Sequence, residues 1–383
     1  MNTNGFAAFT GADASSRARS LVERVQRFNK QVVVSTGEDC VVAFSLQQEE
    51  GWGYPLVHGF MKEGRGEFAY LRKGEGGYVA GRDLLGTRGL YVDETWSCVA
   101  SDHRFFPARP RLMPRGSEIE TASRKVVTAE IVAEPSGLSL EEAAIRLAEL
   151  LRASVKRRVA DSKKVAVSFS GGLDSSLVAF IASKETSVVL CTAYAAGSRD
   201  QEQTRAAADA MGLDLVAKEI GKDDVAEEVR SLDLPFQPSP MDRTLWSLYS
   251  TTSRIAAEQG AGLILLGQLA DELFGGYMKY ALTAKRSPKD AEAMMRADVE
   301  ECGVRAFIRD EEACARFAEA RFPFADESVA SFALGLPLVY KISGGERKIV
   351  LRRTAALLGL PAELVEAPKK AAQYSSGIAK LLP

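Results

Sequence analysis

An apolar run, Val165–Phe169, ends in the loop Ser170-Gly171-Gly172, and a helix-forming stretch that begins with Asp174 follows directly. Glycines let a backbone approach an anion closely, and the N–H groups that open a helix favour negative charge. Asp174 in the same turn would repel bare phosphate, which indicates a bridging Mg²⁺. No Gly-Lys-Ser/Thr follows, so the loop is not of the Walker type; a plain Gly-Gly turn with serine caps is the simpler alternative. The predicted nucleotide contacts are Ser168, Ser170, Gly171, Gly172, Asp174 and Ser175.

A second apolar run, Gly262–Leu266, ends in Gly267 and is followed by the acidic pair Asp271 and Glu272. If both runs are strands of one parallel sheet, their carboxyl ends share an edge, and Asp271 can share a metal ion with Asp174. A helix-capping Asp-Glu pair explains the second motif, taken by itself, equally well. Two such turns in one chain favour the metal site.

Histidine and cysteine limit the remaining chemistry. His58 and His103 are the only histidines, so the chain beyond Arg104 has no imidazole for Ser-His or Cys-His catalysis. The five cysteines show no C-x-x-C spacing, which excludes a zinc ribbon and a disulfide scaffold. Carboxylates, lysines, backbone amides and a bound metal remain. The cysteines are Cys40, Cys98, Cys191, Cys302 and Cys314.

The composition of the 383 residues is that of an ordinary globular chain, and its net charge of −2 is too small to attract nucleic acid or an anionic membrane. No apolar run approaches the roughly 18 residues of a membrane helix. Met1–Phe6 lacks the pattern of a secretory signal, so we expect a cytoplasmic protein. The turn-rich segment Glu134–Gly137 predicts a boundary between two domains, 1–133 and 138–383.

The first region predicts a mostly antiparallel β domain, because short β-like runs alternate with glycine clusters. Ser15–Asn29 is a helix candidate; its arginines could contact nucleic acid, but a solvated amphipathic helix is the favoured interpretation. The predicted strands are Gln31–Ser35, Cys40–Leu46, Phe68–Leu71, Tyr78–Ala80, Gly89–Val92, Val99–Ser101 and Val126–Val132.

The second region predicts an α/β domain with a parallel sheet, because β-rich and helical runs alternate. Its first helix begins at the capping box Ser139–Glu142 and runs to about Arg158. From Ala281 onward the pattern is mainly helical. The predicted strands are Val165–Phe169, Ser187–Tyr194, Leu215–Ile220 and Gly262–Leu266, and the predicted helices between them are Asp174–Ala182, Gln201–Met211 and Arg243–Gln259.

Several motifs of the second region resemble a known family. Ser170–Ser175 matches the SGGxDS loop (PP-loop) of ATP pyrophosphatases, and Gly267–Tyr277 resembles the G-x-x-A-D-E-L-F-G-G-Y segment of asparagine synthetases. Glu319–Asp326, Arg347–Arg352 and Lys369–Gly377 resemble later segments of that family, in the same order. The resemblance runs from about Leu138 to the C-terminus. It implies a parallel-sheet, adenine-nucleotide α-hydrolase-like domain with a helical tail.

In that family, ATP activates a carboxylate as an acyl-adenylate, pyrophosphate leaves, and ammonia attacks to give an amide and AMP. The resemblance implies that Mg²⁺ on Asp174 and Asp271 neutralises the phosphates while Lys348 and Lys370 act as cationic clamps. Lys369 lies next to Lys370, and either can be the tail lysine of the family. Solvated surface lysines are the alternative for these positions.

The resemblance assigns further roles. Glu319 matches a carboxylate that accepts a proton from the attacking nitrogen, although a structural pair with Arg321 also explains it. Ala193 and Tyr194, at the end of a predicted strand, are expected to contact adenine through backbone atoms, and Gly267 lines the nucleotide site. Ser198–Glu202 resembles a nucleotide-fixing stretch, which helix capping explains nearly as well.

The first region resembles the family's N-terminal glutamine amidotransferase domain, an Ntn-hydrolase-like fold, through Gly5–Phe9, Gly81–Tyr91 and Ala100–Asp102. Its catalytic cysteine, which follows Met1 in active members, is missing: Asn2 follows Met1, and Asn4 precedes Gly5. An amide is not a nucleophile. We therefore expect a degenerate domain without glutaminase activity.

The leading hypothesis is an ATP- and Mg²⁺-dependent, AMP-forming amidoligase that joins a small carboxylate, with aspartate as first choice, to ammonia or another amine. A separate glutaminase subunit could supply the ammonia, and a homodimer stays open. The alternatives are an adenylating enzyme with another substrate, such as a β-lactam-synthetase-like cyclase or a modifier of a tRNA base, and a nucleotide-binding regulatory protein without catalysis. The near-neutral charge argues against nucleic acid.

Overall fold

The computed structural model describes residues 5–25, 32–35, 40–44, 56–62, 65–75, 77–198, 200–367 and 376–382. The chain forms two compact units. The first unit consists of Met1–Glu130 and Cys302–Glu311, and the second of Ile131–Glu301 and Glu312–Pro383. The boundaries predicted from the sequence, 1–133 and 138–383, stay a prediction.

The first unit is built on two antiparallel sheets, as the sequence predicted. Side chains alternate across strand β1 (Gly5–Phe9), so Ala7 and Phe9 pack with helix α1 (Ala14–Val25), while Phe6 and Ala8 pack with residues of the second sheet. Strand β1 is therefore buried on both faces. The strand orders are β2-β3-β1-β8-β7-β9 and β11-β10-β6-β5-β4. The other strands are β2 (Val32–Ser35), β3 (Cys40–Phe44), β4 (Leu56–Lys62), β5 (Arg65–Gly74), β6 (Gly77–Arg82), β7 (Tyr91–Val92), β8 (Cys98–Ala100), β9 (Arg111–Leu112), β10 (Ser117–Glu120) and β11 (Lys125–Thr128).

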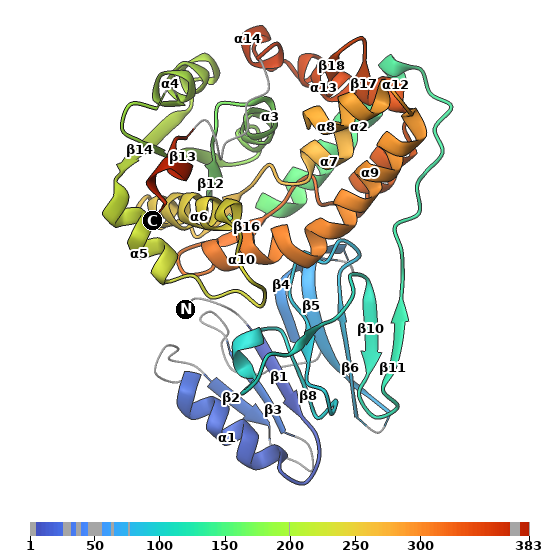
Figure 1. Cartoon of the computed structure of the whole chain (residues 1–383), viewed down its shortest axis with the longest axis vertical. Helices are drawn as coiled ribbons and strands as arrows, with labels where there is room; N and C mark the ends of the chain where they lie inside the picture. The colour runs from blue at the N-terminus through green and yellow to red at the C-terminus, as the bar shows by residue number, and fades with distance from the viewer. Residues whose placement is uncertain are drawn as a thin grey trace. The chain divides into compact units, whose positions relative to one another are not determined.

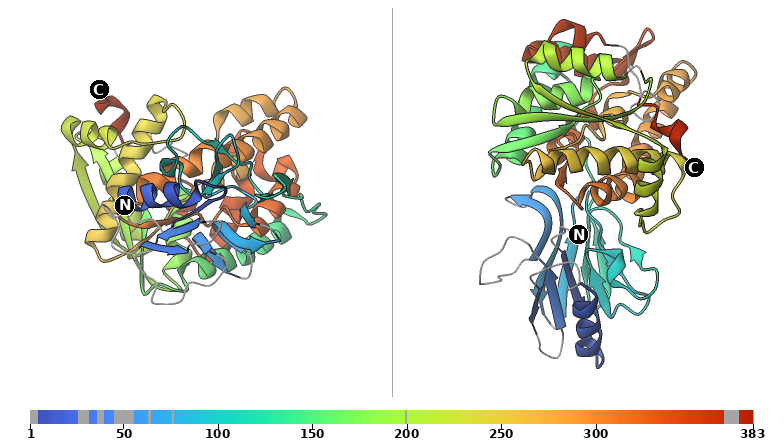
Figure 2. Two further views of the ribbon diagram at one scale, coloured as in Figure 1. Left: turned by 90° about the horizontal axis from the view of Figure 1, so that it is seen from below. Right: turned by 90° about the vertical axis from the view of Figure 1, so that its left-hand side faces the viewer.

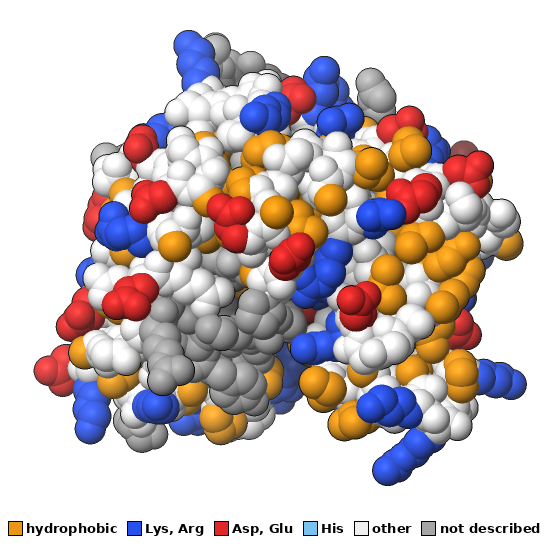
Figure 3. Space-filling view, turned by 90° about the horizontal axis from the view of Figure 1, so that it is seen from above, with side chains coloured by type: hydrophobic (Ala, Val, Ile, Leu, Met, Phe, Trp, Pro, Cys, Tyr) orange, Lys and Arg blue, Asp and Glu red, His pale blue; other side chains and the backbone are white. Residues whose placement is uncertain are grey.

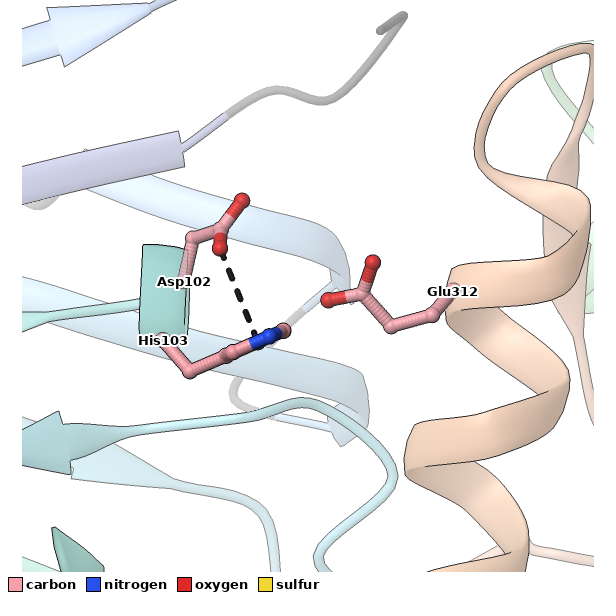
Figure 4. Close-up of side chains that lie close together, drawn as sticks. All are labelled: Asp102, His103 and Glu312. Carbon is pink, nitrogen blue, oxygen red and sulfur yellow. Dashed lines mark ion pairs between the residues drawn. The ribbon is translucent and has the colours of Figure 1, made fainter. Parts of the chain in front are cut away.

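Asp102 and His103 begin the short 3-10 helix η1 (His103–Phe105) in the first unit. The Asp102 carboxylate accepts a hydrogen bond from the backbone N–H of Arg104 at 2.8 Å, and His103 Nδ1 lies 3.8 Å from Asp102 Oδ1 (Figure 4). Burial alone would raise the pKa of Asp102, but the charge and hydrogen bonds of Arg104 bring it below its ordinary value. These contacts give Asp102 a structural role at a helix start.

The second unit contains a five-stranded parallel sheet with the order β14-β13-β12-β15-β16. Helices α3 and α4 lie on one face and α6 on the other (Figures 1 and 2). The chain adds β13 and β14 on one side of β12 and β15 on the other, so the strand order reverses between β12 and β15. A crevice for a ligand forms at the carboxyl ends of strands at such a switch point. The strands are β12 (Lys164–Ser168), β13 (Ser187–Ala195), β14 (Asp214–Ile220), β15 (Leu263–Leu265) and β16 (Glu319–Arg321).

Helices surround this sheet and form the tail of the chain. The capping box of α2 (Leu140–Val159) is confirmed, since Ser139 and Glu142 exchange side-chain-to-backbone hydrogen bonds. Two short strands form a hairpin, β17 (Ile342–Ser343) and β18 (Glu346–Arg347). The other helices of the second unit are α3 (Leu173–Ala182), α4 (Asp200–Met211), α5 (Lys222–Arg230), α6 (Pro240–Glu258), α7 (Ala270–Phe274), α8 (Met278–Ala284), α9 (Pro288–Glu301), α11 (Glu327–Gly335), α12 (Leu338–Lys341), α13 (Ile349–Leu358), α14 (Ala362–Val365) and the 3-10 helix η3 (Ile378–Leu381). The π-helical η2 (Cys302–Ala306) and the larger part of α10 (Phe307–Cys314) belong to the first unit.

From Ala281 onward the described chain is mainly helical, as the sequence predicted, but it also contains strand β16, which the sequence pattern did not indicate. Its three residues include two charged ones and present no apolar run, so their pattern carries no strand signal. Pairing with β15 nevertheless places Glu319–Arg321 at the edge of the sheet. No helix among the described residues has both the length and the apolar character that crossing a bilayer requires.

Candidate active site

The loop after β12 leads into helix α3, which starts without a side-chain cap. Gly172 is the N-cap residue of α3 and forms no side-chain cap. Gly171 adopts a φ of 68°, which glycine reaches without steric cost. The hydroxyl oxygens of Ser170 and Ser175 lie 3.2 Å apart, and Ser175 also accepts a hydrogen bond from the Ser170 N–H at 3.3 Å. The predicted phosphate loop therefore has an open helix start bordered by two hydroxyl groups.

The loop after β15 lies directly against the first loop. A Cβ atom added to Gly267 would be 3.2 Å from the Cβ of Asp174 and 3.4 Å from the backbone nitrogen of Ser175. Helix α7 begins three residues later and carries Asp271 in its first turn. The structure thus brings Asp174, Ser175 and Gly267 together at the carboxyl ends of the parallel strands, the edge where the two loops were expected to meet.

Lys348 joins the two aspartates. Its ammonium nitrogen lies 2.6 Å from both carboxylate oxygens of Asp174 and 2.6 Å from Oδ1 of Asp271. The Lys348 side chain is 3% exposed, and those of Asp174 and Asp271 are 17% and 16% exposed. Burial would lower the pKa of Lys348, but the charges of Asp174 and Asp271 outweigh it and raise the pKa well above its ordinary value. Lys348 is therefore a cation at neutral pH.

The donor set fits Mg²⁺. Two carboxylates from different turns already converge on one cationic centre, the Lys348 ammonium, which stands where a metal ion would be attracted. Carboxylate oxygens are the ligands that Mg²⁺ prefers, and it usually takes its remaining ligands from water and phosphate. Asp174 and Asp271 are the residues that would hold the ion.

Glu272 and Tyr277 form a pair beside this centre, a contact that the sequence did not predict. The Tyr277 hydroxyl donates a hydrogen bond of 2.8 Å to Glu272 Oε1. Burial and the neighbouring charge of Asp271 raise the pKa of Glu272 to about 7. Gly276 lies between Glu272 and Tyr277 in the chain, and a Cβ on Gly276 would be 1.8 Å from Asp271 Oδ1, so the chain packs tightly against the acidic residues at this point.

Glu319 is not brought to this edge. It is the first residue of β16 and pairs in parallel register with Leu263, the first residue of β15, so it lies at the amino end of the sheet. Its carboxylate accepts a hydrogen bond of 2.9 Å from Arg321 Nε, and Arg321 also pairs with Asp161, just before β12. The contacts observed are those of the structural alternative, with the pair on a strand rather than a helix.

The other predicted contacts lie along the same edge or outside the described residues. Ala193 and Tyr194 are buried near the end of β13, and Ser168 lies 3.2 Å from the hydroxyl of Thr252. Lys369 and Lys370 lie outside the described residues, as does Arg199 of the Ser198–Glu202 stretch.

Ala367 and Ser376, the described residues on either side of positions 368–375, contact other parts of the second unit. The Ala367 carbonyl accepts a hydrogen bond of 3.1 Å from Arg352 Nη2, and the Ser376 carbonyl accepts one of 2.8 Å from the N–H of Ala195 at the end of β13. The chain is therefore held on either side of Lys369 and Lys370.

Fold and site together define an α/β protein with a glycine-serine loop and two neighbouring aspartates, Asp174 and Asp271, at the switch point of a parallel sheet. Residues 146–313 and 286–381 match the family Asparagine synthase. The chain belongs to this family, which confirms the resemblance and, with the sheets described above, the predicted fold class.

Two similar proteins show how far the likeness extends. A putative glutamine-hydrolyzing asparagine synthetase of Methanocaldococcus jannaschii is 32% identical over 289 residues, which cover 64% of this chain and 51% of that protein. A probable glutamine-hydrolyzing asparagine synthetase of Schizosaccharomyces pombe is 26% identical over 365 residues, 83% of this chain and 62% of that protein. The chain thus spans between half and two thirds of these relatives. A solved NMN synthetase from Francisella tularensis covers 62% of this chain and 77% of its own at 11% identity and a TM-score of 0.34, too weak a likeness for any argument.

Proposed function

We propose that this chain is an ATP-dependent amidoligase that forms AMP and pyrophosphate, with aspartate as the first-choice acid and ammonia or another amine as the nitrogen donor. The observation that carries the proposal is the convergence of Asp174 and Asp271 on one cationic centre beside the uncapped start of α3. Membership of the Asparagine synthase family supports the same chemistry.

In this proposal the loop after β12 and the loop after β15 have different roles. Bound Mg²⁺–ATP supplies an electrophilic α-phosphorus and a pyrophosphate leaving group. Asp174 and Asp271 hold the metal ion, and the hydroxyl groups of Ser170 and Ser175 with the first N–H groups of α3 orient the phosphates. Lys348, with Lys370 from the tail, stabilises negative charge on the departing pyrophosphate.

Other residues have more limited parts. Ala193 and Tyr194 border the adenine side of the site at the end of β13. We assign Glu319 no part in proton transfer, because it begins β16 in register with the first residue of β15 and its carboxylate pairs with Arg321. The acidic and basic side chains alternate over the described part of the face seen in Figure 3, which argues against a nucleic-acid substrate.

The first unit is proposed to lack glutaminase activity. Asn2 and Asn4 stand in the stretch before β1 where the family's active members have a catalytic cysteine, and an amide cannot take over that role. Nitrogen would then come from free ammonia, from another amine or from a separate glutaminase subunit.

A product assay tests this function. The full chain is incubated with Mg²⁺, labelled ATP and a panel of acids, each with and without ammonia. AMP and pyrophosphate that depend on aspartate and ammonia, with asparagine formed, support the proposal. Pyrophosphate that depends on another acid supports the adenylating alternative, and ATP binding without turnover in any pairing contradicts catalysis and supports a regulatory protein.

A further inference from the structure

Lys348 is held in place by backbone geometry as well as by charge. It precedes α13 with a φ of 60°, in the left-handed region that residues with a side chain rarely adopt. The next turns of α13 are tied down, because Thr354 donates a hydrogen bond of 3.2 Å to the Ala144 carbonyl of α2. A strained backbone of this kind persists only where its surroundings determine it.

The stem of the Lys348 side chain packs against Gly276. A Cβ on Gly276 would lie 2.5 Å from Lys348 Cε, and the Arg347 guanidinium donates a hydrogen bond of 2.6 Å to the Gly276 carbonyl. Before Lys348, the hairpin turn contains Gly344 and Gly345, with φ of 60° and 91° and no atom within 4 Å of an added Cβ. The side chain is thus enclosed, while the turn that precedes it is open.

The same carboxylate oxygens cannot bind the Lys348 ammonium and a divalent metal ion at full strength at the same time. Lys348 Nζ takes both oxygens of Asp174 and Oδ1 of Asp271, the atoms that a divalent ion would use. Two half-buried carboxylates without a cation would be costly, so the ammonium stabilises the site before a ligand arrives. A phosphate group is the natural alternative partner for the ammonium.

We propose that Lys348 is the resident counter-ion of the Asp174–Asp271 pair, and that a divalent metal enters only as the Lys348 ammonium moves from the aspartates to the phosphates of the nucleotide. Metal and nucleotide then bind together rather than one after the other. The inference rests on the proposed function for the presence of a nucleotide, but it makes a separate claim about the apo protein.

Metal binding without nucleotide tests this claim. Mn²⁺ is titrated into the full chain by calorimetry at fixed pH, and Lys348→Met is compared with wild type. Lys348→Met should bind Mn²⁺ at least about tenfold more tightly, because it removes the competing charge from the same oxygens. The matched control is Lys341→Met, which removes a buried lysine of α12 and should bind Mn²⁺ as wild type does. Adding Asp174→Asn to Lys348→Met should abolish the gain.

Two results would overturn the inference: Mn²⁺ affinity in Lys348→Met equal to or weaker than wild type, or an equal gain in Lys341→Met. If Lys348→Met does not fold, the wild-type chain decides. Mn²⁺ alone should then shift its melting temperature little and Mn²⁺ with α,β-methylene-ATP much more than the nucleotide alone; equal shifts with and without nucleotide contradict the proposal. Neither readout needs turnover, so a failed search for the acid substrate leaves this test intact.

Discussion

Glu319 accepts its hydrogen bond from Arg321, two residues further along the same strand, at 2.9 Å between Oε1 and Nε. Arg321 is buried and reaches Asp161 with its other nitrogens, so the pair joins the amino ends of β16 and β12. The carboxylate belongs to the sheet's structure rather than to the edge where the loops meet.

Glu319→Gln should therefore retain pyrophosphate release within about threefold of wild type. Its cost in stability should stay below about 1 kcal/mol, because the Glu319 side chain is 38% exposed and Arg321 keeps Asp161 as a partner. Asp174→Asn, which removes a proposed metal ligand, should lose more than about a hundredfold while the fold persists. Steady-state release assays on both variants make the comparison. Loss of activity in Glu319→Gln to the level of Asp174→Asn would restore Glu319 to the chemistry.

Two adjacent serines, Ser175 and Ser176, are expected to have different roles, the first in ATP binding and the second in packing. Ser175 borders the phosphate loop, whereas the Ser176 hydroxyl is buried and has no hydrogen-bond partner among the described residues. Ser175→Ala should weaken ATP binding about tenfold, the loss expected for a hydrogen bond to a charged group, and Ser176→Ala should not change it. Calorimetric titration with ATP and Mg²⁺ measures both. Equal effects of the two substitutions would contradict the assignment of the loop.

A substitution at Gly276 tests whether the close packing against Asp271 and Lys348 is required for metal and ATP binding. In Gly276→Ala the new methyl group would collide with Asp271 Oδ1 and Lys348 Cε, so the Asp271 carboxylate would be displaced from Asp174. We expect loss of metal-dependent ATP binding, with a lowered melting temperature. Gly262→Ala is the control, since a Cβ there meets nothing within 4 Å and its φ is not positive. Normal nucleotide binding by Gly276→Ala would show that the pair tolerates displacement.

The ion pairs of Asp326 predict that acid lowers the free energy of unfolding. Asp326 is 4% exposed and pairs with Arg157 at 2.6 Å and Arg158 at 3.1 Å. Burial alone would raise the pKa of Asp326, but the charges of Arg158 and Arg157 bring it below its ordinary value. A lowered folded pKa means that the stabilisation is complete above the unfolded pKa of about 3.9 and is lost as the pH falls below it.

Asp326→Asn should consequently lower the free energy of unfolding at pH 7 by about 3 kcal/mol, because it leaves Arg158 buried without its charge partner. The gap between variant and wild type should shrink below about pH 4, because the Asp326 carboxylate of the unfolded wild type becomes protonated there while the folded one stays ionised, which lowers the stability of the wild type alone. Denaturant unfolding at several pH values measures it. A gap that stays constant down to pH 3 would show that the charge of Asp326 does not act as described.

The loop and its helix could be predicted because their signals are local. Strand β12, Gly171, Gly172 and helix α3 occupy the positions that the apolar run and the following helical pattern indicated. That the two loops share one edge also followed from the sequence, since all strands of a parallel sheet present their carboxyl ends at the same edge.

The role of Lys348 could not be predicted in the same way. It contacts Asp174 across 174 positions of sequence, and the contact depends on how α13 packs against α2. The place of Glu319 in the sheet could not be predicted for a related reason: it depends on the register of Glu319 with Leu263, which a three-residue strand does not reveal. The inclusion of Cys302–Glu311 in the first unit likewise rests on long-range contacts, such as the 2.9 Å hydrogen bond from Arg82 to the Gly303 carbonyl.

A crystal structure of the full chain with Mn²⁺ and α,β-methylene-ATP tests the central claim most directly. We predict one anomalous Mn²⁺ peak bonded to oxygens of both Asp174 and Asp271, with the triphosphate at the start of α3. A peak bonded to one aspartate alone, or a nucleotide bound elsewhere with the two carboxylates still on Lys348, would contradict it.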